Sequence, residues 1–155
     1  MALLAKVITV SDGVAGGTRE DRSGVALVER LKVSGFDVVE HVVIPDGVEA
    51  VAAAVRAAAA GFAGLVVTTG GTGFGPRDLT PEGTRAVLER EAPGMAEAMR
   101  LVSPLGRLSR SVAGTVGDTL VLNTPGSTTG CIECLEAVID VVPHALELLT
   151  GGRPH

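Results

Sequence analysis

Aromatic residues and positive charge are both scarce in this chain of 155 residues. It contains three Phe and neither Trp nor Tyr, so stacking platforms for single-stranded nucleic acid are not expected. Thirteen Lys and Arg against eighteen Asp and Glu give a net charge of −5, whereas a duplex-binding protein normally carries a basic face. We therefore expect no nucleic-acid partner. Any bound aromatic ring should be held by aliphatic side chains and backbone.

Long hydrophobic runs are also missing. No segment approaches the roughly 18 apolar residues that a membrane-spanning helix needs. The apolar segment 1–10 has the composition of a signal peptide, but Lys6 interrupts it and Ser11-Asp12-Gly13 follows with no small-residue cleavage site. We interpret it as the first strand and expect a cytoplasmic protein without membrane contact.

Cysteine occurs twice, as Cys131 and Cys134 in a Cys-x-x-Cys spacing. That spacing is compatible with a redox pair or with half of a zinc site. A zinc site needs further ligands, and His41, His144 and His155 have no ligand spacing relative to the pair. We therefore favour two reduced, partly buried thiols.

The alternation of elements predicts an α/β fold. The chain has the length of one common domain, so we expect a single domain over 1–155. Apolar, β-branched runs such as Leu65-Val66-Val67 are typical of strands buried on both faces, which favours a mostly parallel sheet in a three-layer sandwich, with helices on both faces. The expected strands lie at 3–10, 37–44 and 63–69, and the expected helices at 22–34 and 47–60.

The C-terminal half predicts a change of strand direction. Residues 111–116 and 119–123 flank a two-residue turn at 117–118, which is typical of a hairpin and adds one antiparallel strand. Further helices are expected at 81–90, 94–102, 127–140 and 143–149, and a frayed tail at 151–155. Thr80 is the expected N-cap of the first of these helices. Met95, Met99 and Val102 form a stripe that we assign to the core.

The glycine-rich turn after the strand at 63–69 predicts an anion site. Thr69-Gly70-Gly71-Thr72-Gly73 exposes backbone N–H groups without side chains in the way. The turn lacks the Lys of a P-loop and the glycine spacing of a dinucleotide site. An ordinary turn that needs a positive φ is the alternative, and Phe74 is expected to plug the core.

Asp78 suggests a metal ion at this turn. A carboxylate that faces phosphates is repulsive unless a divalent cation lies between them, so Asp78, next to Arg77, predicts Mg²⁺. An ion pair with Arg77 is the alternative. The segments at 11–24, 44–47, 69–78 and 123–127 all follow predicted strands, and such segments meet at the carboxyl edge of a parallel sheet. Local positive charge is expected near these loops, at Arg19, Arg22, Arg77, Arg107 and Arg110.

Many short motifs follow one another along almost the whole chain: Thr9-Val10-Ser11-Asp12, Asp21-Arg22-Ser23-Gly24, Ile44-Pro45-Asp46, Thr69-Gly70-Gly71-Thr72-Gly73, Pro76-Arg77-Asp78-Leu79-Thr80-Pro81-Glu82, Glu91-Ala92-Pro93-Gly94-Met95, Leu108-Ser109-Arg110-Ser111 and Leu122-Asn123-Thr124-Pro125-Gly126-Ser127. In this order they resemble the molybdopterin adenylyltransferases, that is, MogA proteins and the G domains of gephyrin and its plant counterpart. The resemblance implies adenylyl transfer from ATP to the terminal phosphate of molybdopterin. The nucleophile is then a phosphate monoester, already mostly dianionic at pH 7, so no strong general base is required.

The resemblance also implies roles for individual residues. Asp46 and Asp78 correspond to catalytic residues that hold Mg²⁺. The positions implied for the pterin and its phosphate are Thr69, Gly70, Gly71, Thr72, Gly73, Arg77, Ser103, Ser109, Arg110, Asn123, Pro125, Gly126 and Ser127. The positions implied for the nucleotide are Ser11, Asp12, Asp21, Ser23 and Gly24.

Structural alternatives remain for several of these residues. Asp46 could be the N-cap of the helix at 47–60, Asp21 the N-cap of the helix at 22–34, and Asn123 a residue that satisfies backbone groups at its strand end. A MoaB-like protein that binds molybdopterin or nucleotide with little catalysis is the alternative function. The resemblance further implies a homotrimer and a MoeA-type molybdenum insertase as a partner.

Overall fold

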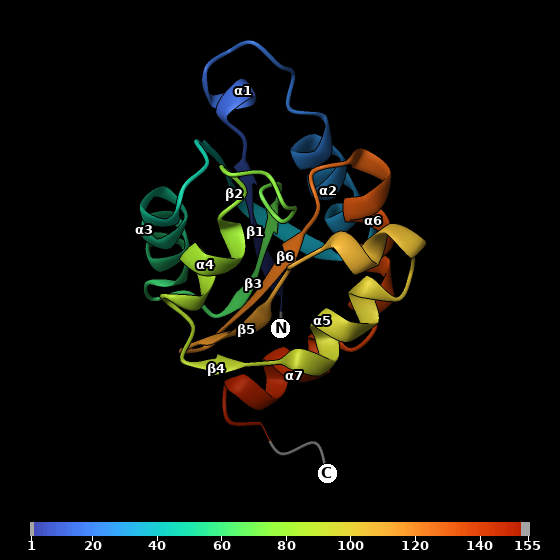
Figure 1. The fold of residues 1–155 in the computed structure, drawn as a ribbon. Helices are drawn as coiled ribbons and strands as arrows, with labels where there is room; N and C mark the ends of the chain where they lie inside the picture. Colours follow the sequence, from blue (N-terminus) through green and yellow to red (C-terminus); the bar gives the residue numbers. More distant parts are fainter. Residues whose placement is uncertain (1, 153–155) are drawn as a thin grey trace.

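The computed structural model describes residues 2–152, and its centre is a six-stranded sheet (Figure 1). The strands are β1 (Leu3–Val10), β2 (Phe36–Ile44), β3 (Gly64–Thr69), β4 (Arg90–Glu91), β5 (Ala113–Val116) and β6 (Thr119–Thr124), in the spatial order β2-β1-β3-β6-β5-β4. Strands β2, β1, β3 and β6 pair in parallel, and β5 is antiparallel to both of its neighbours. This confirms the predicted α/β fold with one antiparallel strand.

Helices cover both faces of the sheet, as the sequence predicts (Figure 1). Helices α3 and α4 lie on one face, and α2, α5, α6 and α7 lie on the other. The helices are α1 (Asp12–Ala15), α2 (Arg22–Val33), α3 (Val48–Ala59), α4 (Thr80–Arg85), α5 (Pro93–Arg100), α6 (Thr128–Val138) and α7 (Val142–Leu149), with a 3₁₀ helix η1 (Pro104–Leu108). Within residues 2–152, none of them has the length and apolar character needed to cross a bilayer.

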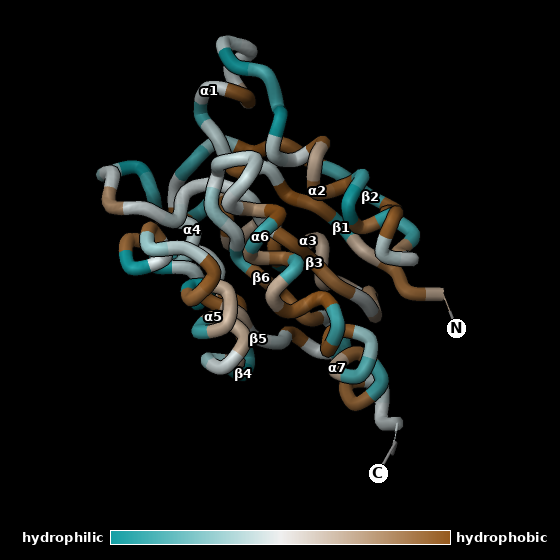
Figure 2. The backbone as a smooth tube through the Cα atoms, turned by 90° about the vertical axis from the view of Figure 1, so that its right-hand side faces the viewer, coloured by the Kyte–Doolittle hydropathy of each residue, from teal (hydrophilic) through white to brown (hydrophobic). Residues whose placement is uncertain are grey.

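The period of two along the strands divides the core into two layers. Leu65 and Val67 of β3 pack in the layer with α2, α5, α6 and α7, whereas Val66 packs in the layer with α3. All three side chains are fully buried. Figure 2 shows the apolar colour concentrated along β1, β3 and β6, in contrast to the hydrophilic loop that follows α1. The central strands are therefore apolar on both faces because helices cover both.

The helix predicted at 81–90 is shorter than expected. It ends at Arg85, and the chain then leads into β4. Directly before β4, the N–H of Glu89 donates to the carbonyl of Thr115. Backbone pairing with β5 thus prevails over helix propensity. Thr80 is the first helical residue and not the cap, because its hydroxyl donates to the carbonyl of Gly70.

The other differences from the predictions are two unpredicted short helices and the exposure of Val102. The short helix α1 and the 3₁₀ helix η1 were not predicted. In the expected core stripe Met99 is buried and Met95 packs against the core, but Val102 follows the end of α5 and is 39% exposed. The tail predicted at 151–155 falls partly on residues 153–155, which lie outside the described range.

The packing of α4 on α3 generates a stability prediction at Gly83. A Cβ at Gly83 would lie 2.6 Å from the Cβ of Val51 and 2.8 Å from the carbonyl oxygen of Val48. Gly83→Ala should therefore lower the free energy of unfolding by about 1–3 kcal/mol, because the two helix backbones must separate. Urea unfolding measures the change.

Gly94 is the matched control, because a Cβ at this helical glycine would meet no atom within 4 Å. Gly94→Ala should leave stability unchanged or raise it by up to about 1 kcal/mol through helix propensity. Equal effects of the two substitutions would contradict the packing argument.

Candidate functional site

The carboxyl ends of three parallel strands open into one cleft. Thr9 of β1 pairs with Thr69 of β3, which pairs with Thr124 of β6, so the loops that follow leave from the same edge. These loops surround a cleft of about 950 Å³. Of the predicted site residues, those that line it are Ser11, Asp21, Ser23, Asp46, Thr69, Gly70, Gly71, Thr72, Gly73, Asp78, Ser109, Pro125, Gly126 and Ser127.

The glycine-rich turn forms the floor of this cleft. Gly70 and Gly71 have φ of 101° and 70°, in the left-handed region that favours glycine. A Cβ on Gly70 would collide with the carbonyl oxygen of Val10, and one on Gly71 would lie 3.1 Å from Oδ1 of Asp46. The turn therefore brings bare backbone close to both β1 and the Asp46 carboxylate, with no side chain covering the backbone N–H groups that an anion cradle uses.

Asp12, Asp46 and Arg77 tie three loops together at one side of the cleft. The N–H of Asp12 donates to Oδ2 of Asp46 at 2.9 Å, and the N–H of Asp46 donates to Oδ1 of Asp12 at 3.1 Å. Arg77 donates two hydrogen bonds of 3.1 Å to the Asp12 carboxylate and one of 2.9 Å to the carbonyl of Asp46. Arg77 thus pairs with Asp12 and not with Asp78, and Asp46 does not cap α3, whose N-cap is Gly47.

The electrostatics of Asp12 and Asp46 differ because their surroundings differ. The hydrogen-bonded Arg77 guanidinium lowers the pKa of Asp12. Burial raises the pKa of Asp46, and the negative charges of Asp12 and Asp78 raise it further. Of these two carboxylates, that of Asp46 lines the cleft and is repelled by the charges of Asp12 and Asp78. A bound cation would offset this repulsion.

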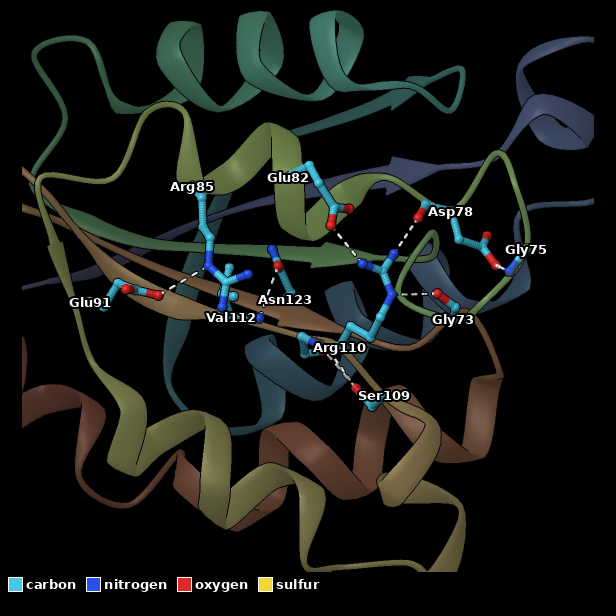
Figure 3. Close-up of polar contacts among 11 residues, drawn as sticks. Gly73, Gly75, Asp78, Glu82, Arg85, Glu91, Ser109, Arg110, Val112 and Asn123 are labelled. Atoms are coloured by element: carbon cyan, nitrogen blue, oxygen red, sulfur yellow. Dashed lines mark hydrogen bonds and ion pairs between the residues drawn. The ribbon is translucent and has the colours of Figure 1, made fainter.

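Asp46 and Asp78 are a donor set that fits a hard divalent cation. Oδ2 of Asp78 accepts from the N–H of Gly75 at 2.9 Å, which fixes the carboxylate in its loop (Figure 3). Each of the two carboxylates keeps one oxygen without a hydrogen bond from residues 2–152. Mg²⁺ typically uses one or two carboxylates and completes its octahedron with water and substrate phosphates. Among residues 2–152 there is no group of three or more His, Cys, Asp or Glu that could hold a metal ion.

Arg110 is committed to the protein. Its guanidinium donates to the carbonyls of Gly73 and Asp78 and to Oε2 of Glu82, the last at 2.6 Å (Figure 3). This hydrogen bond lowers the pKa of Glu82. Arg110 therefore fastens the loop at 73–78 to α4 from outside the cleft, and neither Arg110 nor Arg77 lines the cleft.

Residues 6–144 match the sequence pattern of a family described as a probable molybdopterin binding domain. The chain belongs to this molybdopterin-binding family. The match includes every element from β1 to the start of α7, and with it all the loops of the cleft.

Individual relatives agree with the family assignment. The chain is 36% identical over 153 residues to a molybdopterin adenylyltransferase of Helicobacter pylori, covering 94% of this chain and 87% of the relative. A molybdenum cofactor biosynthesis bifunctional protein of Chlorobaculum tepidum is 34% identical over 94% of this chain, and the chain spans about half, 48%, of its length. The crystal structure of the molybdopterin biosynthesis enzyme MoaB from Thermus thermophilus superposes with a TM-score of 0.90 at 46% identity, covering 96% of this chain and 97% of that chain.

The loop between β1 and α2, whose residues are predicted to contact the nucleotide, is held by hydroxyl and carboxylate caps. Ser11 caps α1, and Asp21 caps α2 by accepting from the N–H of Gly24 at 3.0 Å. This confirms the capping alternative for Asp21, which nevertheless lines the cleft. The Thr9 hydroxyl donates to Oδ2 of Asp21 at 2.9 Å, and His41 Nε2 lies 3.0 Å from the same oxygen.

Several residues that line the cleft were not among the predicted site residues, and the prediction that Phe74 plugs the core was wrong. Thr9, Val10, Val14, Arg19, Glu20, Arg22, Leu105, Leu108 and Thr128 also line the cleft. The sequence did indicate Arg19 and Arg22, because both lie in the motif loop at 11–24. Leu105 and Leu108 belong to η1, which apolar periodicity did not predict. Phe74 is 71% exposed and does not plug the core, because its loop lies outside both core layers.

A smaller cavity of about 300 Å³ adjoins the cleft at Ser109 and Pro125, and Ser103 lines this cavity rather than the cleft. Cys134 lies in its wall. Cys131 and Cys134 are free and buried, and burial raises the pKa of both thiols to about 11. This agrees with the predicted reduced, buried thiols.

Asn123 faces the protein interior and lines neither cavity. Its side chain is fully buried, and Oδ1 accepts from the N–H of Val112 (Figure 3). Nδ2 donates to the hydroxyls of Thr68 and Thr84. The geometry thus favours the alternative in which Asn123 satisfies buried polar groups next to β6.

Asn123→Ala should lower the free energy of unfolding by about 2–3 kcal/mol, because the buried N–H of Val112 and two hydroxyls lose their partner. Thr84→Ala should cost less, since Nδ2 retains Thr68. Chemical denaturation of both variants measures this. Wild-type stability of Asn123→Ala, together with weakened molybdopterin binding, would instead indicate direct ligand contact.

Proposed function

We propose that this chain transfers the adenylyl group of ATP to the terminal phosphate of molybdopterin. In this reaction a molybdopterin phosphate oxygen forms a bond to the α-phosphorus of ATP, and the bond from that phosphorus to the bridging oxygen breaks. The products are adenylyl-molybdopterin and pyrophosphate. The observation that carries the proposal is the pair Asp46 and Asp78, which line one cleft together with a glycine cradle whose Cβ positions are blocked.

The chain's own groups supply what this reaction needs. The phosphate nucleophile is already ionised at neutral pH, so the protein must hold two anions in line rather than remove a proton. The N–H groups of residues 71–73 provide positive dipole at the cleft floor, whereas the N–H of Gly70 donates to the carbonyl of Thr124. Asp46 and Asp78 would hold Mg²⁺, which when bound neutralises phosphate charge. Cross-linking of loops by Arg77 and Arg110 keeps these groups in place before the substrates arrive.

A second candidate is a MoaB-like protein that binds molybdopterin or nucleotide with little catalysis. The 46% identity to the Thermus thermophilus MoaB supports it. Both acidic residues of the proposed metal pair are present in this chain, which supports the catalytic candidate instead. Incubation with molybdopterin, ATP and Mg²⁺ separates the two, because only the first releases pyrophosphate and forms adenylyl-molybdopterin. Hydrolysis of ATP that does not depend on molybdopterin would contradict both.

Asp46→Asn and Asp78→Asn should each reduce adenylyl transfer roughly a hundredfold or more, because each removes a carboxylate proposed to hold Mg²⁺ against the reacting phosphates. Molybdopterin binding and the melting temperature should hardly change, since the amide oxygen of Asn can still accept the N–H of Asp12 or Gly75. Initial rates at several Mg²⁺ concentrations and thermal melts on the same samples test this.

Asp118→Asn, in the exposed hairpin turn, is the charge-matched control and should match the wild type. If Asp46→Asn turned over at the wild-type rate under limiting Mg²⁺, Asp46 would have no metal-binding role.

The same proposal extends to the oligomeric state, the compartment and the partner protein. We infer that one domain over 1–155 acts as a homotrimer in the cytoplasm and passes its product to a MoeA-type molybdenum insertase. The family resemblance supports the assembly, and the use of ATP supports the compartment. Light scattering at micromolar protein should give three times the chain mass of 15.6 kDa. A monomer mass would contradict the trimer.

A further inference from the structure

The charged side chains that line the cleft are mostly acidic and would repel a polyanion unless further positive charge is present. Four carboxylates line it, from Glu20, Asp21, Asp46 and Asp78, against the guanidinium groups of Arg19 and Arg22. The whole chain carries a net charge of −5. A nucleotide triphosphate therefore needs local positive charge beyond the glycine cradle and a metal ion.

The arginines near the cleft differ in whether they are already paired. Arg77 is bound to Asp12, Arg110 to Glu82, and Arg22 lies 3.3 Å from Glu20. Arg19 differs from these three, because no carboxylate or carbonyl of residues 2–152 accepts a hydrogen bond from its side chain. Among these four arginines it is the one whose donors are available to a ligand.

The loop that carries Arg19 is built around Gly13. The carbonyl of Gly13 accepts from the N–H groups of Thr18 and Arg19 at 2.9 and 3.1 Å, and from the Thr18 hydroxyl at 3.2 Å. The stem of Arg19 lies directly on Gly13, where a Cβ would come within 2.6 Å of Cδ of Arg19. The absence of a side chain at Gly13 thus allows the stem of Arg19 to lie against α1, while the exposed side chain lines the cleft.

The position of this loop indicates which part of the ligand it meets. Helix α1 and the loop to α2 project beyond the carboxyl edge of the sheet (Figure 1), whereas Gly70 and Thr72 at the cleft floor are buried. Arg19 is exposed at the outer wall. A ligand group that reaches the outer wall of the cleft therefore meets the Arg19 guanidinium, which binds phosphate oxygens well.

We propose that Arg19 binds the β- and γ-phosphates of ATP and the pyrophosphate formed from them, held in place by its contact with Gly13. This inference rests on the proposed adenylyl transfer. It assigns a binding residue that the glycine cradle and the acidic pair do not supply. A guanidinium binds phosphate oxygens through paired N–H donors. Because the proposed contact is to the β- and γ-phosphates, AMP, which lacks them, does not gain it.

Calorimetric titration of ATP, pyrophosphate and AMP into the protein with Mg²⁺ tests the assignment without turnover. Arg19→Gln should weaken ATP and pyrophosphate binding roughly tenfold, the effect of one lost charge-assisted contact, and leave AMP binding unchanged. The loss should diminish at high salt, because the contact is exposed. Arg56→Gln removes the same charge from an exposed position of α3 outside the cleft and should bind all three ligands as the wild type does.

A second variant tests the contact with Gly13. Gly13→Ala should displace the Arg19 stem and reproduce the selective loss of ATP and pyrophosphate binding, with an unchanged helical spectrum and melting temperature. In an Arg19→Ala background the same substitution should add nothing, since the obstructed side chain is gone.

The outcomes separate the two levels of the proposal. Wild-type ATP affinity in Arg19→Gln, or an equal loss for AMP, would overturn the role of Arg19 while leaving adenylyl transfer intact. A wild-type protein that binds neither ATP nor pyrophosphate would overturn both.

Discussion

Parallel pairing of β1, β3 and β6 in one register is the constraint on which the site depends. It sets Thr9, Thr69 and Thr124 side by side at the carboxyl edge. Each hydroxyl then fastens its strand end to another segment: Thr9 to Asp21, Thr69 to the carbonyl of Pro125, and Thr124 to the carbonyl of Thr68. Because side chains alternate between faces, a one-residue shift of β3 would exchange its two core layers and turn Thr69 away from these partners. Core packing and the hydrogen bonds at the cleft therefore require the same pairing register of β3 with its neighbours.

The arginines near the cleft have two different tasks: some hold loops together, and another is available to bind the ligand. Arg77 and Arg110 each bridge segments distant in the chain and thereby fix the Asp46 and Asp78 loops. A guanidinium suits this task because its fork of donors can satisfy a carboxylate and a carbonyl together. The dipoles and carboxylates of the site are therefore already oriented in the free protein. Such an arrangement needs little reorganisation of the protein when charge develops in the transition state. Arg19, on the projecting loop, is left to contact solvent-facing phosphate.

Strands and long helices were predictable because their signals are local. The run Leu65-Val66-Val67 marks β3, and the positions of α2 and α3 follow from apolar periodicity bounded by Asp21 and Gly61. The errors fall where a distant partner competes with local preference. Residues beyond Arg85 leave the helix to pair with β5, and the Thr80 hydroxyl bonds Gly70 instead of capping. Phe74 was misjudged because hydrophobicity alone does not tell where a loop lies relative to the core.

The sequence by itself determined the fold class, the family, and the segments that form the cleft, because each is encoded in short contiguous patterns: strand runs, glycine turns and motif order. Which way the motif side chains face was decided only by the tertiary structure. Arg77 meets Asp12 across 65 positions of the chain, Arg110 meets the carbonyl of Asp78 across 32, and Asn123 meets Thr68 across 55. A motif shows that a polar residue is present, but whether it bonds ligand or protein depends on what the folded chain brings within hydrogen-bond distance.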